Sequence, residues 1–253
     1  MPRTLTSARR HYNLTVLIAR RAVREARKVR RQGATAVAGV VAAHQVTQAH
    51  QAQAAVAQML DEQAIESVAD ALLNVASFTT EARALERMIE AADTDAEFDR
   101  MVESIVQDAA RAAESVSVAV REDIWHVRFV SPPCCSRCAI LAGRVYRYSE
   151  GFLRHPNCDC SMIPTTVASP LRQSPEQLVE DGMVTGLSKA DLKALSDGAD
   201  LGRVVNVRSK KAGLLEAGHA ITRGGRPTPA GIYRLASDRA QAVELLRRYG
   251  YIR

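Results

Sequence analysis

The chain has 253 residues, of which 47% are hydrophobic and 25% are charged. These fractions are those of ordinary globular proteins, so the composition excludes a disordered chain. A membrane-spanning helix needs about 18 or more consecutive apolar residues, and the sequence has no such run. Its first residues lead into charged positions without an apolar segment, so we expect no secretory signal, no membrane association and a cytosolic protein.

The net charge of +6 conceals a segregation of charge along the chain. Residues 1–31 hold ten basic residues and one acidic residue, whereas residues 32–125 hold five basic and sixteen acidic residues. The basic run from Arg20 to Arg31 could meet nucleic-acid phosphates, which dominate nonspecific affinity. It could equally be a solvated helix face, and the sequence leaves both alternatives open. No aromatic residue interleaves with the run, so base stacking is not expected.

The N-terminal half is predicted to be a helical domain spanning residues 1–124. Neither glycine nor proline occurs in residues 40–131, and both residue types interrupt helices. We expect a basic helix that ends near Gly33, followed by a helix rich in alanine and valine that runs to about Leu60. Large aromatic side chains are scarce in this half, so we expect its helices to pack through Ala, Val, Leu and Ile.

Two further helices are predicted in the same half. Between Ile65 and Ala76 the apolar residues recur at helical spacing, which predicts an amphipathic helix. Thr94 followed by Glu97 forms a capping box, which predicts the start of another helix. The buried face expected for that last helix consists of Phe98, Met101, Val102, Ile105, Val106 and Ala109.

The pattern changes at Trp125, where apolar residues begin to alternate with polar ones and predict a short strand. Residues 125–173 contain all five cysteines, and we interpret them as a compact, loop-rich α+β module. Residues 174–253 are predicted to form short helices. The helix-start signals are at Ser174 and Ser188, a basic arm is expected at 210–229, and a last helix is expected at 237–249.

Five side chains of the central module have the spacing of a zinc site. Cys135 and Cys138 form a C-x2-C pair, and after sixteen intervening residues His155, Cys158 and Cys160 form an H-x2-C-x-C group. Zinc is held by four nitrogen or sulfur ligands, and ligand pairs on two loops provide such a set. Cys135, Cys138 and His155 are the expected ligands, while Cys158 and Cys160 compete for the fourth position.

A structural Zn²⁺ is the favoured interpretation of this cluster. A module of about forty residues with few large apolar side chains needs a cross-link, and metal binding supplies folding free energy. The alternatives are disulfides, buried thiols, or a catalytic cysteine with His126 or His155 as its base. Cys134 is expected to lie outside the ligand set. The fold class predicted overall is mainly α, with long N-terminal helices, a small α+β zinc-binding module and a short-helix C-terminal region.

Three sequence blocks follow one another in the module: Trp125-His126-Val127-Arg128, Gly143-Arg144-Val145-Tyr146 and His155-Pro156-Asn157-Cys158-Asp159-Cys160. With the C-x2-C pair they resemble the core of MuF-like phage head morphogenesis proteins. Blocks at 197–200, 204–208, 232–235 and 245–252 resemble the actinobacteriophage branch of that family. The resemblance covers residues 125–253, whereas the helical half matches in character only. The doubled Cys134-Cys135 departs from the simpler family pattern.

The resemblance implies a minor capsid protein of the virion that is associated with the portal and lies inside the head. Its implied partners are the phage portal protein and the major capsid or scaffold protein, and assembly would take place in the host cytoplasm. Packaged DNA is a further expected contact, through the basic N-terminal helix. Some neighbours of such proteins are labelled capsid maturation proteases, which supplies an alternative function. The sequence contains none of the standard hydrolase, zincin or P-loop signatures.

Overall fold

The computed structural model describes residues 5–69, 71, 73–147, 160–168, 171, 173–207 and 226–253. Within these ranges the protein is mainly helical, as predicted, and all its strands are short. None of the described helices has the length and apolar character that crossing a bilayer requires.

Contacts group the described residues into two compact units. Unit 1 contains the long helices α1 to α4 with strands β1, β3 and β4, and unit 2 contains β2, α5, β5 and helices α6 to α10. The division into domains at 1–124, 125–173 and 174–253 stays a prediction. Contacts assign parts of the middle segment to both units, because its longer strands pair within unit 1 and its cysteine pair packs within unit 2.

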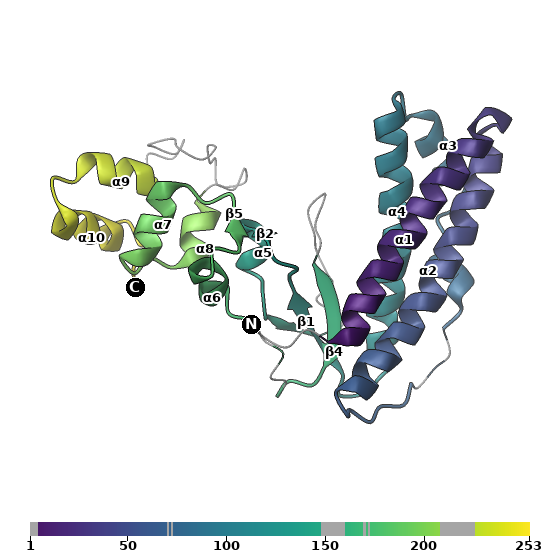
Figure 1. The fold of residues 1–253 in the computed structure, drawn as a ribbon, viewed down its shortest axis with the longest axis horizontal. Coiled ribbons are helices and arrows are strands. Elements are labelled where there is room, and N and C mark those ends of the chain that lie inside the picture. The colour runs from purple at the N-terminus through teal and green to yellow at the C-terminus, as the bar shows by residue number, and fades with distance from the viewer. Residues whose placement is uncertain are drawn as a thin grey trace. The chain divides into compact units, whose positions relative to one another are not determined.

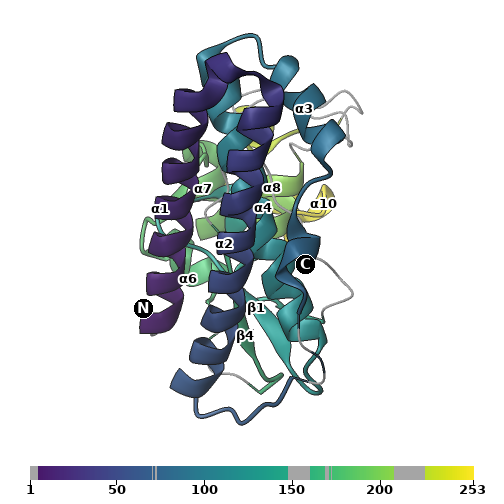
Figure 2. The same ribbon diagram turned by 90° about the vertical axis from the view of Figure 1, so that its right-hand side faces the viewer.

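The body of unit 1 is a helical bundle (Figures 1 and 2). It comprises α1 (Thr6–Val29), α2 (Ala34–Glu62), α3 (Ala82–Glu90) and α4 (Asp95–Ala119), with α1, α2 and α4 side by side. The helices meet through small and branched side chains, including Ala22, Val41 and Val102, all fully buried. Packing through small aliphatic residues is therefore confirmed. Four buried alanines line the contact of α2 with α4: Ala49, Ala52, Ala110 and Ala113.

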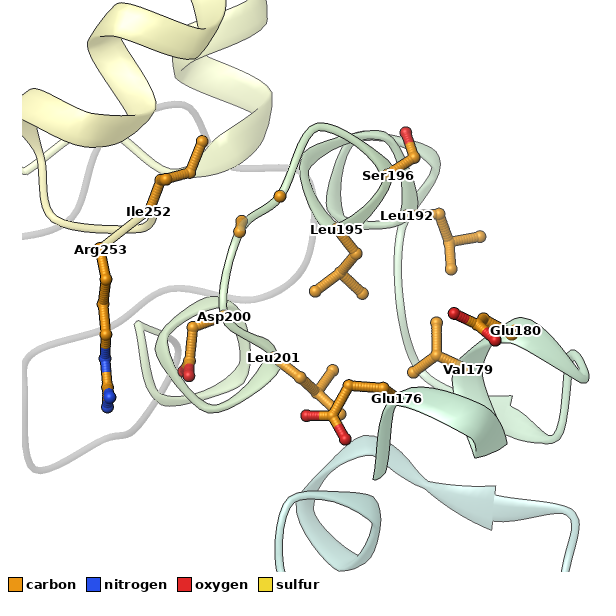
Figure 3. A pocket seen from close by; sticks show the side chains of 12 residues that line it. Glu176, Val179, Glu180, Leu192, Leu195, Ser196, Asp200, Leu201, Ile252 and Arg253 are labelled. Carbon is orange, nitrogen blue, oxygen red and sulfur yellow. The ribbon is translucent and has the colours of Figure 1, made fainter. Parts of the chain in front are cut away.

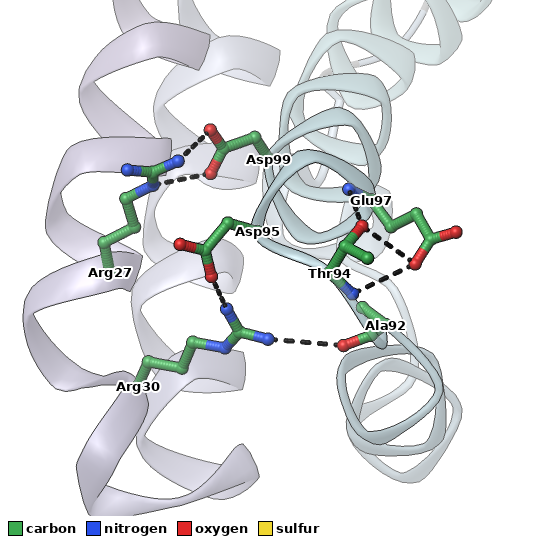
Figure 4. A network of polar contacts seen from close by, with 7 residues as sticks. All are labelled: Arg27, Arg30, Ala92, Thr94, Asp95, Glu97 and Asp99. Atoms are coloured by element: carbon green, nitrogen blue, oxygen red, sulfur yellow. Dashed lines mark hydrogen bonds and ion pairs between the residues drawn. The ribbon is translucent and has the colours of Figure 1, made fainter.

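The turn between α1 and α2 is fixed by polar contacts at the start of α4 (Figure 4). Residues Arg30–Gln32 form a 3-10 turn, and Gly33 follows with φ +109°, so the first helix ends where the sequence predicted. Arg27 donates from Nε to Asp99 at 2.7 Å, and Arg30 donates from Nη1 to Asp95 at 2.6 Å. These carboxylates lie in the first turns of α4, where they also compensate the positive end of its helix dipole.

The predicted capping box at the start of α4 is confirmed. The Glu97 backbone N–H donates to the Thr94 hydroxyl at 3.2 Å, and the Thr94 backbone N–H donates to the Glu97 carboxylate at 3.0 Å. The buried face predicted for this helix is also present, because Phe98, Val102 and Val106 are fully buried and Ala109 is nearly so.

The amphipathic helix predicted from Ile65 to Ala76 is wrong. Described residues there have no regular structure before a 3-10 turn at Val75–Phe78, and Val68 is 84% exposed. The reason is the end of α2, where Ala64 adopts a left-handed conformation with φ +53° and Ile65 donates back to the Leu60 carbonyl. This C-terminal motif turns the chain away, and Ile65 packs against Leu60 instead of starting a new helix.

A polar layer crosses the bundle between α1, α2 and α4. His11 of α1 is 5% exposed, and its Nδ1 lies 2.8 Å from Gln51 Oε1. Its Nε2 hydrogen bonds to the Glu114 carboxylate, which is also buried. Burial lowers the pKa of His11, and nearby Arg111 lowers it further, but Glu114 and the bond to Gln51 outweigh both, so that the pKa is raised above 6.5.

The sheet of unit 1 has the order β3-β1-β4 and is antiparallel throughout. It consists of β1 (Trp125–Phe129), β3 (Val145–Tyr146) and β4 (Ser161–Thr165). The strand predicted at Trp125 is confirmed. Its polar residues His126 and Arg128 are also buried, and β1 is the central strand of the sheet. The alternation of apolar and polar residues in the sequence did not indicate that the polar positions would be buried.

Unit 2 is built from short helices whose starts are defined by side-chain caps. These helices are α5 (Ser136–Ala139), α6 (Pro175–Glu180), α7 (Lys189–Ser196), α8 (Leu201–Asn206), α9 (Pro229–Leu235) and α10 (Arg239–Arg248). The predicted caps at Ser174 and Ser188 are confirmed, and Asp200, Thr228 and Asp238 cap further helices. Of the predicted basic arm, residues 210–225 lie outside the described residues.

The bond between His11 and Glu114 predicts that protonation stabilises the bundle. Because folding raises the pKa of His11, its contribution is fully present below about pH 6.5 and is lost as the pH rises through the raised pKa. Glu114→Gln should bring the pKa of His11 below 6.5, since burial then acts without an opposing carboxylate. NMR titration of the His11 ring measures this shift directly.

Urea unfolding of the wild type and of His11→Gln at about pH 6 and pH 8 measures the linked stability. The wild type should lose more stability between these values than His11→Gln. His50→Gln is the matched control, because His50 is an exposed histidine of α2. Equal pH dependence in the wild type and His11→Gln would contradict the prediction.

Candidate metal centre

The C-x2-C pair lies in a tight turn of unit 2 between a strand and a helix. Strand β2 (Cys134–Cys135) pairs in parallel with β5 (Val184–Thr185), and helix α5 follows directly. The Cys134 backbone N–H donates to the Met183 carbonyl at 2.9 Å, and the Thr185 hydroxyl donates to the Cys134 carbonyl at 3.2 Å. These bonds hold the backbone that presents the first sulfur of the pair.

Within this turn, the sulfur of Cys135 caps the start of α5. The backbone N–H of Cys138 donates to Cys135 Sγ over 3.4 Å. Hydrogen bonds of this kind orient a metal-binding side chain. Cys135 is half-buried and Cys138 is 4% exposed. The donor chemistry of this turn therefore fits one half of a zinc site.

The other half of the expected ligand set is only partly described. Cys160 is 6% exposed and precedes β4, whereas His155 and Cys158 lie outside the described residues. Among the described residues, no three His, Cys, Asp or Glu side chains form a group that could hold a metal ion. The structure thus joins Cys135 to Cys138 and does not bring Cys160 into a three-donor group with them. The zinc site remains a prediction.

Cys134 differs chemically from its neighbour. Burial raises the pKa of the Cys134 thiol to about 11, and the proximity of Cys135 raises it as well, while a backbone hydrogen bond at Cys134 opposes the change. A thiol with that pKa is protonated at neutral pH and is a poor nucleophile. This agrees with the expectation that Cys134 does not carry the chemistry of the cluster.

Two of the sequence blocks contribute strands to the sheet of unit 1, and Cys160, the described end of the third block, directly precedes β4. His126 in β1 pairs with Tyr146 in β3, and their rings stack with centroids 5.4 Å apart. On the other edge, Val127 pairs with Ile163 of β4, the strand that follows Cys160. The guanidinium of Arg147 lies 4.8 Å from the centre of the Trp125 ring. Stacking and strand pairing therefore join segments that are far apart in the sequence.

Gly143 and Gln173 form a tight contact within unit 2. The Gln173 side chain exchanges two hydrogen bonds with the Val130 backbone, at 2.7 and 2.9 Å, as a neighbouring strand would. Gly143 has φ +67°, and a Cβ atom there would lie 2.2 Å from the Gln173 carbonyl oxygen. Only glycine can occupy this position without displacing the Gln173 backbone.

Sequence reasoning missed a cavity of about 720 Å³ in unit 2, which Figure 3 shows from close by. Apolar side chains of α6, α7 and α8 line it, and carboxylates of α6 stand at its edge. The residues that define this character are Val179, Leu192, Leu195, Leu201, Glu176 and Glu180. The sequence holds no local signal for this cavity, because its lining comes from segments that only the fold brings together.

Asp197 and Asp200 lie three residues apart in unit 2 and have structural partners. Asp200 accepts from the Arg203 backbone N–H at 2.8 Å and caps α8. Asp197 accepts from the Tyr233 hydroxyl at 2.7 Å and from Arg239 Nε at 2.8 Å.

Comparison of the chain with family models, with curated proteins and with solved structures found no match.

The contact of Gly143 with Gln173 predicts a large effect of adding one methyl group. Gly143→Ala should lower the free energy of unfolding by about 2 to 5 kcal/mol, because it combines a left-handed backbone with a clash against a backbone oxygen. Gly39→Ala is the matched control, since Gly39 lies in α2 with open space around it and should gain about 1 kcal/mol. Urea unfolding followed by circular dichroism measures both. Equal stability of Gly143→Ala and the wild type would contradict the prediction.

Proposed function

We propose that this chain is a minor head protein of the MuF-like type that assembles with a phage portal protein and acts through its structure. The observation that carries the proposal is where the resembling blocks lie. The first block belongs to β1, the second ends in its neighbour β3, and the third ends at Cys160, directly before its other neighbour β4. Two of the blocks therefore contribute residues to paired strands of one sheet, and the described end of the third directly precedes the remaining strand, an arrangement that supports one structural motif.

The architecture of both units suits a part of a larger assembly. Unit 1 presents long helices, which offer extended side faces to partners, and unit 2 has a cavity with an apolar lining and an acidic edge. The portal protein and the major capsid or scaffold protein are the proposed partners, and the interior of the head is the proposed location.

In this proposal a structural Zn²⁺ stabilises the segment around the cysteine pair. Cys135 and Cys138 would hold it from one loop, and His155 with Cys158 or Cys160 would complete the set. The ion would supply a cross-link between chain segments whose strands are too short to be stable alone. With four protein ligands, the site would leave no position for a reacting water molecule.

Purified protein should therefore contain about one zinc ion per chain by elemental analysis. The double variant Cys135→Ser and Cys138→Ser should lose the ion, because a serine hydroxyl cannot replace a thiolate ligand. It should also unfold at a lower urea concentration. Cys134→Ser is the matched control and should keep the zinc content of the wild type. Loss of zinc from the control, or its retention in the double variant, would show that the ligand set is wrong.

Association with the portal is tested with purified components. The chain and the portal protein of the phage proposed to encode it should elute together in size-exclusion chromatography after nuclease treatment, and the chain should be detected in purified virions by mass spectrometry. Separate elution together with absence from virions would contradict the proposed function.

The same samples distinguish the proposed structural role from the alternative function, a capsid maturation protease. Incubation of the chain with the major capsid or scaffold protein should leave the intact masses of both unchanged. A cleaved product that disappears when one Ser, Cys or His of this chain is substituted would favour the alternative.

A further inference from the structure

The outward face of α1 and of the turn that follows it carries a row of positive side chains. Arg20, Arg24 and Lys28 follow one another at intervals of four residues in α1, which places them on one face of the helix, and Arg31 follows in the 3-10 turn. Arg9 and Arg10 lie about three turns before Arg20 in the same helix. We call these six residues the cationic row, and all of them are exposed.

Other cations of the same region form ion pairs with carboxylates of the bundle and do not belong to the row. Arg27 and Arg30 bind carboxylates at the start of α4, and Arg21 pairs with Glu25 at 2.7 Å (Figure 4 shows the first two). The side chains of the cationic row form no hydrogen bond or ion pair with any described residue. Glu25 is the one acidic residue in 1–31. Its carboxylate accepts from Arg21 Nε, and its Oε2 lies 3.4 Å from His44 Nε2. Glu25 also interacts electrostatically with Lys28, but the described residues of the bundle supply no ion pair to any member of the row.

The chemistry of this face indicates what can bind it. Protein interfaces usually have an apolar centre, whereas Leu17, which is 57% exposed, is the single large apolar side chain exposed along α1. No aromatic residue lies between Arg20 and Arg31, so this part of the row offers no platform for stacking single-stranded bases. From Arg9 to Arg31 the row extends over about 33 Å at 1.5 Å per residue, close to one turn of B-form DNA.

We propose that the cationic row of α1 binds the phosphate backbone of duplex DNA without sequence preference. The positive charges are fixed on a rigid helix, and each phosphate contact releases condensed counterions, which drives association. DNA binding by the row rests on the proposed function only for the source of the DNA, which would be the genome packaged in the head.

The experiment measures binding of the full-length protein to a fluorescent 30-base-pair duplex by anisotropy, at several salt concentrations between about 50 and 200 mM. If six phosphates are contacted, log K should fall with log salt with a slope of about −5, a loss of about a thousandfold over this range. The variant with Arg20, Arg24, Lys28 and Arg31 replaced by Gln should retain a slope of only about −2. Glutamine has a helix propensity similar to that of Lys and Arg, so α1 should persist, which circular dichroism checks.

The matched control removes the same charge elsewhere. Lys189, Arg234, Arg247 and Arg248 are exposed cations of unit 2, and their replacement by Gln changes the net charge equally. This control should keep the slope of the wild type. An equal decrease of the salt slope in both variants would show that binding depends only on net charge. An unchanged slope in the α1 variant would show that the row makes no phosphate contact. Either result overturns the proposal.

A competitor distinguishes DNA from an acidic protein partner. Unlabelled duplex should displace the probe at a much lower charge concentration than poly-L-glutamate does, and equal displacement would overturn the preference for DNA. The assay contains no portal protein, and the portal assay contains no DNA. Failure of DNA binding with intact portal binding would therefore refute this inference alone, and the reverse result would refute the proposed function alone.

Discussion

Strand β1 is paired along both of its edges, and the central part of the chain depends on that pairing. Its neighbour β3 and the strands β2 and β5 have only two residues each, which is too few for a stable sheet. Side-chain hydrogen bonds therefore supply connections that the backbone hydrogen bonds of longer strands would otherwise provide. Gln63 holds the Pro164 backbone of β4 at 2.8 Å, and Gln173 pairs with Val130. The Cys135 sulfur closes the turn before α5, and a metal ion bound there would add the cross-link that this region otherwise lacks.

The sequence predicted those parts of the fold that depend on local chemistry. The caps at Thr94, Ser174 and Ser188 and the strand at Trp125 need only a few adjacent residues, and each was found where expected. The helix predicted after Ile65 failed, because helical spacing does not show whether the apolar residues have a surface to pack against. Of the candidate site, the sequence identified the Cys135 and Cys138 turn, whereas the cavity beside α6 and α7 depends on packing between distant segments.

The segregation of charge seen in the sequence has two structural meanings. Part of the positive charge at the N-terminus is paired within the molecule, because Arg27 and Arg30 bind the carboxylates of Asp99 and Asp95 near the start of α4. The cationic row faces outward along α1 and the turn that follows it. The buried polar layer around His11 adds a third electrostatic feature, since it must be satisfied within a core made mostly of alanine and valine.

The central claim is that sulfur and nitrogen side chains of residues 135–160 hold one zinc ion as a structural cross-link. X-ray absorption spectroscopy at the zinc edge of the purified protein tests it most directly. The account predicts a four-coordinate ion with sulfur neighbours at about 2.3 Å and a nitrogen neighbour at about 2.0 Å. A folded chain that retains no zinc, or a zinc ion surrounded only by oxygen, would contradict it.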